Sequence, residues 1–381
     1  MFIANWVGLN STNENLVCMD RLSKAIESLK AYELDALILL NQANITYFLE
    51  KPLDYSAVIF YTDGEIHVVT HALEYPRAKL LRNVNIHLYS TKNRNRGEIL
   101  AKDIVEAIGK VVRENVDRVG IEGYSIPYTT YTRLSNILNN VEIIDATDAI
   151  WRFRLIKSQD EIEKIKNASK TVSKAIGRAI EIIKPGISEV EVAAHIVYEI
   201  YSMNGFTDIQ PIVASGSRSA IPHARAGSKT IRGGETVVVD IVAKHSEYYS
   251  DMTRTIATRN ITNELRKIYE VVREAQEEAL DTVKPEVLCS EVDDAARKLI
   301  RSYGYSKYFI HSTGHSIGLD VHEYLRIAEN VDTRLKEGMT ITIEPGIYME
   351  NIGGVRIEDT VLVTSNKAEI LTKYSKDFIE V

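Results

Sequence analysis

The first 150 residues alternate between short apolar runs and longer amphipathic segments, a pattern typical of an α/β domain. SAVIFYT and EIHVVT are β-rich runs that meet at Asp63-Gly64, a pair that favours a hairpin turn. Apolar residues at helical spacing predict helices, and compact apolar runs predict buried strands. We expect helices at 19–32 and 97–113, strands at 35–40 and 118–122, and a further helix and strand ending near Ala149.

A short arm, residues 1–18, precedes these elements and has no assignable role. Residues 1–150 contain no phosphate-binding loop, no cluster of His or Cys, and no nucleophile elbow. We therefore interpret them as an α/β scaffold or oligomerisation domain, and we place a second domain at residues 151–381.

The pattern changes after Trp151, where one long helix is predicted at residues 158–183. Ser158, followed three residues later by Glu161, is a capping-box pattern that marks the start of a helix. Pro185-Gly186 ends the helical pattern.

A two-copy repeat follows. Residues 179–206 and 279–305 share an apolar helix end, a Lys-Pro pair, a Ser-Glu-Val helix start and a Gly-aromatic end. GETVVVDI (234–241) then matches GMTITIEP (338–345), and DMTRTIAT (251–258) matches EDTVLVT (358–364). A repeat of helix, helix and hairpin predicts two halves related by a pseudo-twofold axis.

The repeat places Asp240 opposite Glu344 and Asp251 opposite Glu358. A single Asp in a strand is usually a turn or edge residue, but Asp240 and Glu344 each follow three β-branched residues. Acidic side chains are almost never fully buried unless they are paired, because desolvation costs several kcal/mol for each ion. One or two divalent cations near the axis explain four such carboxylates.

A cluster of basic side chains is the alternative source of compensating charge, but only Arg254 and Arg356 lie nearby in sequence. The segment HSTGHSIGLDVHEY (311–324) offers nitrogen ligands, with His311, His315 and His322 as candidates. We interpret His311 as a surface or hydrogen-bonding residue. Oxygen-rich ligands with one imidazole favour Mn²⁺ or Fe²⁺, with Co²⁺ and Zn²⁺ as alternatives. A two-metal site makes a nucleophile from water, which predicts a hydrolase.

Composition narrows the class of protein further. The chain has 381 residues, 45% hydrophobic and 26% charged, which is typical of a globular protein. Its net charge of −7 without a basic patch argues against nucleic acid as a partner. No apolar run reaches the roughly 18–20 residues of a membrane span, no signal peptide is evident, and Cys18 and Cys289 form no CxxC. We expect a cytoplasmic enzyme.

Five motifs together resemble the "pita-bread" metallopeptidases, the family of methionine aminopeptidase, aminopeptidase P, prolidase and creatinase. The motifs are Pro222-His223, SDMTRT at 250–255, GHSIGLDVHE at 314–323, EPGIY at 344–348 and GGVRIEDT at 353–360, together with Asp240. The resemblance covers about residues 155–365. The N-terminal region is similar to the creatinase-type domain, which favours the prolidase side of the family. The implied fold is α+β, a pita-bread domain with pseudo-twofold duplication and a smaller N-terminal α/β domain.

The resemblance also implies a role for each site residue. Asp251 and Glu358 are expected to bridge two divalent metal ions, with Asp240 completing one shell and His315 and Glu344 the other. Glu344 is expected to take the proton of an attacking metal-bridged hydroxide or water. His223 and His322 are expected to contact the scissile carbonyl and the tetrahedral intermediate, and Arg356 to orient a ligand carboxylate or a substrate group.

The implied substrate is an Xaa-Pro dipeptide, with its proline ring in an apolar pocket, and the implied assembly is a homodimer. Aminopeptidase P, which acts on longer Xaa-Pro peptides, is the main alternative, and a non-catalytic binding protein on the same fold is the second. Creatinase lacks the full ligand set. The chain departs from the family at Val242, Glu247 and Ser316, where glycine is often found, and these departures bear on the shape of the pocket and not on the ligands.

Overall fold

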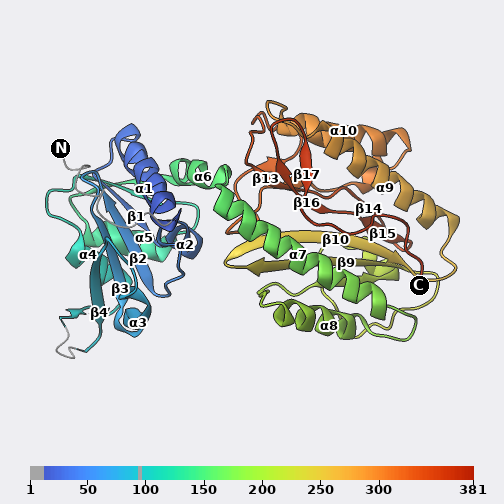
Figure 1. The fold of residues 1–381 in the computed structure, drawn as a ribbon, viewed down its shortest axis with the longest axis horizontal. Helices are drawn as coiled ribbons and strands as arrows, with labels where there is room; N and C mark the ends of the chain where they lie inside the picture. The colour runs from blue at the N-terminus through green and yellow to red at the C-terminus, as the bar shows by residue number, and fades with distance from the viewer. Residues whose placement is uncertain (1–12, 93–96) are drawn as a thin grey trace. The chain divides into compact units, whose positions relative to one another are not determined.

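The computed structural model describes residues 13–92 and 97–381, and it divides into two compact units, Met1–Arg154 and Leu155–Val381 (Figure 1). We expect the boundary between the two domains after residue 150, and in the structure the first unit ends at Arg154. Residues 1–12 of the expected N-terminal arm lie outside the described residues. Residues 13–18 of the arm belong to helix α1, which begins at Asn13.

The first unit is built on a seven-stranded sheet with strand order β5-β4-β3-β2-β1-β6-β7. β2 is antiparallel to both of its neighbours, and the other neighbouring pairs are parallel. The elements of this unit, in order, are α1 Asn13–Ala31, β1 Ala36–Leu39, α2 Gln42–Leu49, β2 Ser56–Tyr61, β3 Ile66–His71, α3 Tyr75–Ala78, β4 Asn85–Ser90, β5 Ile99–Leu100, α4 Ile104–Val111, β6 Arg118–Ile121, α5 Tyr128–Ile137, β7 Glu142–Asp145 and α6 Thr147–Leu155.

The hairpin around Asp63-Gly64 and the strands β1 and β6 are confirmed. The helix expected at 97–113 is wrong in its first half. Residues Ile99–Leu100 pair with β4 as an edge strand, and α4 starts only at Ile104. The reason is local: the Asp103 side chain accepts the N–H groups of Val105 and Glu106 and fixes the helix start there.

The second unit contains both copies of the repeat, and in each copy two helices pack on their own strands (Figure 1). The elements of the first copy are α7 Gln159–Ile182, α8 Glu189–Ser202, β8 Ile212–Ser215, β9 Thr236–His245 and β10 Tyr248–Ala257. The elements of the second copy are α9 Asn263–Thr282, α10 Cys289–Ser302, β11 Gly314–His315, β12 Arg326–Ile327, β13 Thr340–Ile343, β14 Gly346–Met349, β15 Gly353–Arg356, β16 Asp359–Val363 and β17 Ala368–Ile370.

The helix starts agree with the repeat, with one change of register. Ser158 and Glu161 form the expected capping box of α7. Ser188 caps α8, but the equivalent position in α10 is Leu288 and not Ser290, because α8 and α10 begin at Glu189 and Cys289. The Ser-Glu-Val alignment was therefore shifted by two residues in the second copy. Within the described residues, no helix combines the length and the apolar character that a membrane span requires.

Candidate metal centre

The β9–β10 hairpin brings Asp240 and Asp251 to one face of its ribbon. Asp251 pairs with Val242, and Thr253 pairs with Asp240, so the two carboxylates are diagonal neighbours across the antiparallel pair. Diagonal neighbours share a face because side chains alternate along each strand. The strands run further than the AKHSE segment suggested, and only Ser246 and Glu247 form the turn.

The second copy delivers Glu344 and Glu358 at the end of another antiparallel pair. Ile343, the last residue of β13, pairs with Asp359, the first residue of β16, so the two glutamates flank the paired region. The two copies are joined where the Glu358 N–H donates to the Thr253 carbonyl at 3.1 Å. The Thr253 hydroxyl also donates to the Glu358 carboxylate, at 2.6 Å.

His315 comes from β11, which lies close to β13 because Gly314 has no side chain. A Cβ at Gly314 would lie 1.9 Å from the Thr342 carbonyl oxygen. The imidazole Nδ1 lies 3.2 Å from the Ser316 carbonyl oxygen, so Nδ1–H donates there and the Nε2 lone pair faces the acids. His315 Nε2 lies 3.4 Å from Glu344 Oε1 and 4.0 Å from Asp251 Oδ2.

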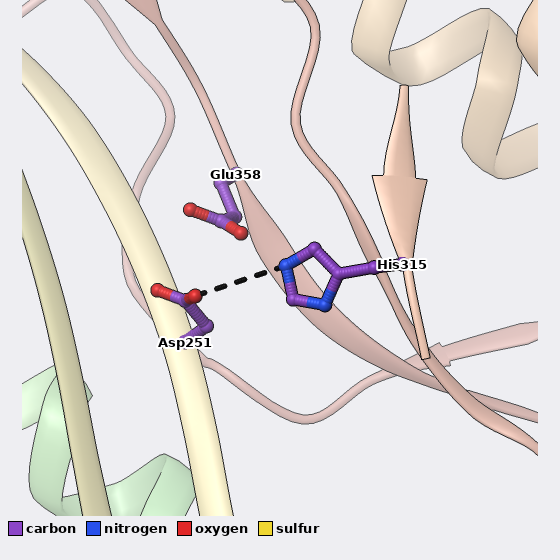
Figure 2. A group of neighbouring side chains, drawn as sticks. All are labelled: Asp251, His315 and Glu358. Carbon is purple, nitrogen blue, oxygen red and sulfur yellow. Dashed lines mark ion pairs between the residues drawn. The ribbon is translucent and has the colours of Figure 1, made fainter. Parts of the chain in front are cut away.

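Asp251, His315 and Glu358 converge on one point from three different strands or strand ends (Figure 2). One ligand atom from each lies within 4.8 Å of the other two, and all three side chains are buried. Among the described residues, no donor reaches Asp240 Oδ1, Asp251 Oδ1 or Glu358 Oε1, although all three atoms are buried. Buried carboxylate oxygens without donors fit divalent cations, which supply the missing positive charge.

Burial and mutual repulsion set the protonation of this group in the absence of a cation. Burial raises the pKa of Asp251 and of Glu358, and their acidic neighbours raise both further. Burial raises the pKa of Glu344 to about 8. Burial lowers the pKa of His315 to about 3, so its imidazole is neutral and able to bind a metal.

Arg356 lies behind Asp240 and is itself buried. Its Nη2 donates to Asp240 Oδ2 at 2.7 Å, its Nε donates to the Thr253 hydroxyl, and its Nη1 donates to the Tyr348 hydroxyl. Arg356 is expected to orient either a ligand carboxylate or a substrate group, and its contact with Asp240 favours the ligand carboxylate.

His311 is a partly buried hydrogen-bonding residue and not a surface residue. Its Nε2 lies 2.9 Å from the Tyr348 hydroxyl, and burial lowers its pKa to about 4. Tyr348 therefore links His311 to Arg356. Tyr348 belongs to the EPGIY motif, which by itself assigns it no role, and the long-range contacts with His311 and Arg356 supply one.

His223 and His322 lie at the exposed side of the site. The His322 ring is packed against that of His315, with centroids 4.3 Å apart and planes at 71°. His223 is exposed, and the pKa of His322 is lowered by burial and then by the charge of Arg326. Neither histidine belongs to the Asp251–His315–Glu358 group.

Three positions carry a side chain where the family often has glycine, and the structure accommodates each of these side chains through local contacts or backbone conformation. Val242 packs with Tyr249, Ile317 and Val321 in a small buried apolar cluster next to the acids. The Ser316 hydroxyl accepts the Leu325 N–H at 3.0 Å. Glu247 takes a left-handed conformation in the β9–β10 turn, with φ of 70°.

Comparison with known proteins agrees with this geometry. The model of metallopeptidase family M24 matches residues 163–365, more than half of the chain, and that of the creatinase/prolidase N-terminal domain matches residues 21–156. This chain belongs to metallopeptidase family M24. Members of this family are metal-dependent hydrolases, and the buried Asp, His and Glu group of this M24 chain suits divalent metal ions.

Three relatives extend the match over nearly the full length of this M24 chain. It is 39% identical to the Xaa-Pro dipeptidase of Pyrococcus furiosus over 363 residues, 94% of this chain and 99% of that protein. The crystal structure of the prolidase from Pyrococcus horikoshii aligns with a TM-score of 0.87 at 37% identity, over 94% of this chain and 100% of that one. The X-Pro aminopeptidase of Thermotoga maritima aligns with a TM-score of 0.84 at 28% identity, over 94% and 99%. The expected pita-bread fold with a creatinase-type N-terminal domain is confirmed.

Proposed function

We propose that this protein is a dinuclear-metal peptidase that hydrolyses Xaa-Pro dipeptides. The observation that carries the proposal is the buried Asp251–His315–Glu358 group, whose carboxylate oxygens lack donors, in a chain similar to Xaa-Pro dipeptidases along almost its whole length. A peptide bond is hydrolysed by such a site because bound divalent ions lower the pKa of water and polarise a carbonyl.

In this proposal five residues hold the two ions. Asp251 and Glu358 would be shared by the ions, and Asp240, His315 and Glu344 would complete their ligand set. The excess of carboxylate oxygen over nitrogen favours Mn²⁺, with Co²⁺, Fe²⁺ and Zn²⁺ as alternatives. Arg356 orients Asp240 through the 2.7 Å contact to its Oδ2.

The protein's own groups handle the proton and the substrate carbonyl. Glu344, whose Oε1 lies 3.4 Å from His315 Nε2, is positioned to accept a proton from the attacking water and to return it to the leaving nitrogen. His322 and His223, at the exposed side, donate hydrogen bonds to the scissile carbonyl and to the developing oxyanion. The proline ring of the substrate would occupy an apolar pocket beside the metal centre, as the resemblance to prolidases implies.

A substrate panel tests the proposed specificity. The purified protein is loaded with each candidate metal in turn and offered an Xaa-Pro dipeptide, an Xaa-Pro-Yaa tripeptide and an Xaa-Ala dipeptide. We expect the highest kcat/KM for the Xaa-Pro dipeptide. Preference for the tripeptide would instead support aminopeptidase P, the activity named for the Thermotoga maritima relative.

A metal analysis tests the catalytic assignment against a non-catalytic binding role. We expect two equivalents of divalent metal per chain after reconstitution, and an Asp251→Asn variant with reduced metal occupancy and no activity, because a bridging charge is lost. A wild-type protein that holds no stoichiometric metal would favour the binding role.

We also propose a homodimer in the cytoplasm, as the resemblance to prolidases and the sparse use of cysteine suggest. Light scattering after size exclusion should give twice the mass of the chain. A monomer at micromolar concentration, or recovery of the protein in an extracellular fraction, would contradict this part of the proposal.

A further inference from the structure

The two strands that carry Asp251 and Glu358 are linked by polar contacts on both of their faces. On one face, Asp251 and Thr253 point toward the candidate metal centre, where Thr253 contacts the Glu358 carboxylate. Because side chains alternate along a strand, Arg254 and Asp359 project to the opposite face. There Arg254 Nη2 donates to Asp359 Oδ1 at 2.8 Å, and both side chains are almost fully buried.

Arg254 uses all five of its N–H donors. Nη1 donates to the carbonyl oxygens of Thr253 and Glu358, at 2.9 and 2.7 Å. Nη2 donates to Asp359 Oδ1 and to the Tyr374 carbonyl, and Nε donates to the Ser375 carbonyl. One guanidinium therefore joins the backbone on both sides of the metal centre, and only a planar fork of donors can satisfy this arrangement.

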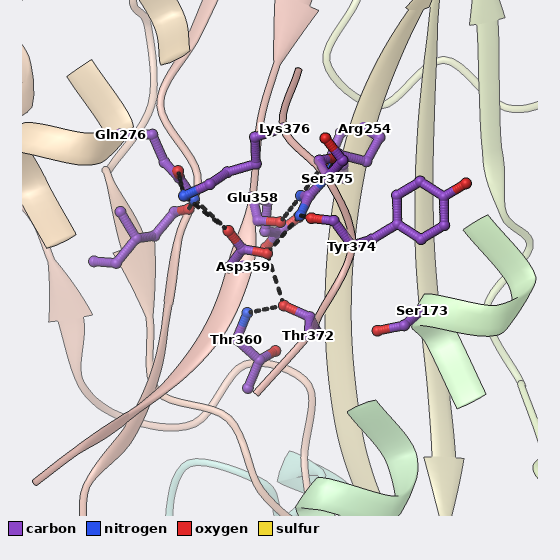
Figure 3. A network of polar contacts seen from close by, with 12 residues as sticks. Ser173, Arg254, Gln276, Glu358, Asp359, Thr360, Thr372, Tyr374, Ser375 and Lys376 are labelled. Atoms are coloured by element: carbon purple, nitrogen blue, oxygen red, sulfur yellow. Dashed lines mark hydrogen bonds and ion pairs between the residues drawn. The ribbon is translucent and has the colours of Figure 1, made fainter. Parts of the chain in front are cut away.

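Asp359 is held equally firmly. Its Oδ1 also accepts the Thr372 hydroxyl at 2.9 Å, and its Oδ2 accepts Gln276 Nε2 at 2.8 Å. Lys376 Nζ lies 3.7 Å from Oδ2 and donates to Gln276 Oε1. Figure 3 shows Asp359 at the centre of these contacts, with residues 372–376, which we call the C-terminal strap, running past it.

The strap also reaches the Asp251 strand through Thr360. The Thr360 hydroxyl donates to the Asp251 carbonyl at 2.8 Å and accepts the Asp251 N–H at 3.0 Å. The Thr360 N–H in turn donates to the Thr372 hydroxyl. The Glu358 backbone thus contacts Arg254 of the buried ion pair directly, and the Asp251 backbone is connected to the strap through Thr360.

We propose that the Arg254–Asp359 pair and the C-terminal strap form a positioning unit that sets the affinity of the metal centre. Asp251 and Glu358 come from different copies of the repeat, and their carboxylates must lie close together to bind a common cation. The positioning unit holds them together before a cation arrives, so less of the binding free energy is spent on ordering. This inference deepens the proposed metal-dependent function and rests on it.

The decisive measurement is the affinity with which the metal-free protein binds an added divalent metal ion. Asp359→Asn removes the charge of the pair and keeps its shape, and Lys376→Met removes a partly exposed contact of the strap. Titration of Mn²⁺ or Zn²⁺ against a chromogenic chelator should show affinity reduced about 10- to 100-fold for Asp359→Asn, the range for outer contacts of metal ligands. The reduction for Lys376→Met should be smaller but measurable.

Arg266→Met is the matched control. Arg266 forms an exposed ion pair with Glu380, also near the C-terminus. The Glu380 backbone pairs with Ala257 at the end of β10, six residues from Asp251, and a change of the Arg266 side chain leaves that backbone pairing in place. Loss of the ion pair should leave metal affinity unchanged, because exposed pairs contribute little. Equal affinity in wild type, Asp359→Asn and Lys376→Met would overturn the inference. Failure of the wild type itself to bind metal would instead overturn the proposed function.

Two further readouts distinguish a role in positioning the metal ligands from a purely structural role. The visible absorption of the Co²⁺-loaded protein reports ligand geometry, and we expect it to change in Asp359→Asn and not in Arg266→Met. Arg254→Lys, which keeps the charge, should bind metal more tightly than Arg254→Met. If Asp359→Asn does not fold, Lys376→Met decides the question: unchanged affinity and an unchanged Co²⁺ spectrum in that variant would refute the inference.

Discussion

Individual residues at the metal centre differ in how well sequence alone could assign them. The repeat identified Asp240, Asp251, Glu344 and Glu358 because equivalent positions of both copies carry an acid, and Asp240 and Glu344 each follow three β-branched residues. The sequence indicates Arg254 only as a nearby charge, and the family resemblance implies that Arg356 orients a ligand carboxylate or a substrate group. Both are buried partners of acids, Asp359 and Asp240. Such pairings connect residues more than 100 positions apart, and no local pattern contains them.

His223 is expected to act on turnover without affecting metal binding. It is exposed and lies outside the buried ligand group. In His223→Ala we expect two bound metals, as in wild type, and a kcat lowered by up to about 10²–10³-fold, the effect of losing one donor to a developing oxyanion. Steady-state kinetics with parallel metal analysis checks this. Full activity would remove His223 from the mechanism, and loss of metal would make it a ligand.

The stability of the metal-free protein should fall as pH rises from 6.5 to 8. The pKa of Glu344 is about 8 in the fold against 4.5 unfolded, and the pKa values of Asp251 and Glu358 are also raised. The folded state therefore binds more protons than the unfolded chain, and it loses stability as these acids ionise. His315, whose pKa is lowered from 6.5 to about 3, acts in the opposite direction, but its effect is complete above pH 6.5.

Urea unfolding of chelator-treated protein across this pH range measures the effect. Metal-loaded protein should not show it, because bound cations keep the carboxylates ionised in the fold. Glu344→Gln should reduce the slope, since one of the titrating groups is gone. A metal-free protein whose free energy of unfolding rises between pH 6.5 and 8 would contradict the assignment.

Among the elements, those with strong local signals were predicted well and those that depend on distant partners were not. The capping box at Ser158 and the Asp63-Gly64 hairpin are set by neighbouring residues. The Ile99–Leu100 strand exists only because β4 offers it an edge, so periodicity alone extended a helix over it. Likewise, Leu288 takes the cap position of α10 without a capping side chain, and the sequence signal pointed to Ser290.

A double substitution in the β9–β10 turn is expected to stabilise the folded protein. His245 pairs with Tyr248, which leaves Ser246 and Glu247 as a two-residue turn, with φ of 50° and 70°. Positive φ at both positions favours Asn-Gly. Ser246→Asn combined with Glu247→Gly should raise the free energy of unfolding by roughly 0.5–1 kcal/mol, because strain at a non-glycine residue is relieved.

Urea unfolding of the metal-loaded protein checks this value. Glu247→Ala is the control, since it removes the 3.7 Å ion pair with Lys244 but still places a side chain in the left-handed region. We expect no gain from this control. A destabilised Asn-Gly variant would show that the Glu247 side chain contributes more than the backbone strain costs.

At the scale of the whole molecule, the repeat predicted the pseudo-twofold arrangement, while the separation into two units followed from a change of pattern near Trp151. Each unit has its own buried core: one cluster runs from Ala36 to Leu138, and the others lie entirely within the second unit. The sequence could not show that the C-terminal strap returns to the metal centre, because its contacts with Arg254 and Asp359 depend on the completed fold.

Because each unit has its own buried core, we expect metal binding to stabilise the two units unequally. A ligand at 100 times its Kd stabilises the state that binds it by about 2.7 kcal/mol, but only segments whose opening breaks the site share this gain. Hydrogen exchange should therefore slow in β10 and β16, which border the ligands, and remain unchanged in β1 and β2 of the first unit. Asp251→Asn, with the same metal added, should lose the protection in β10 and β16. Equal slowing of exchange in β1 and β2 would mean that the two units open together, and the metal centre would then govern the stability of the entire chain.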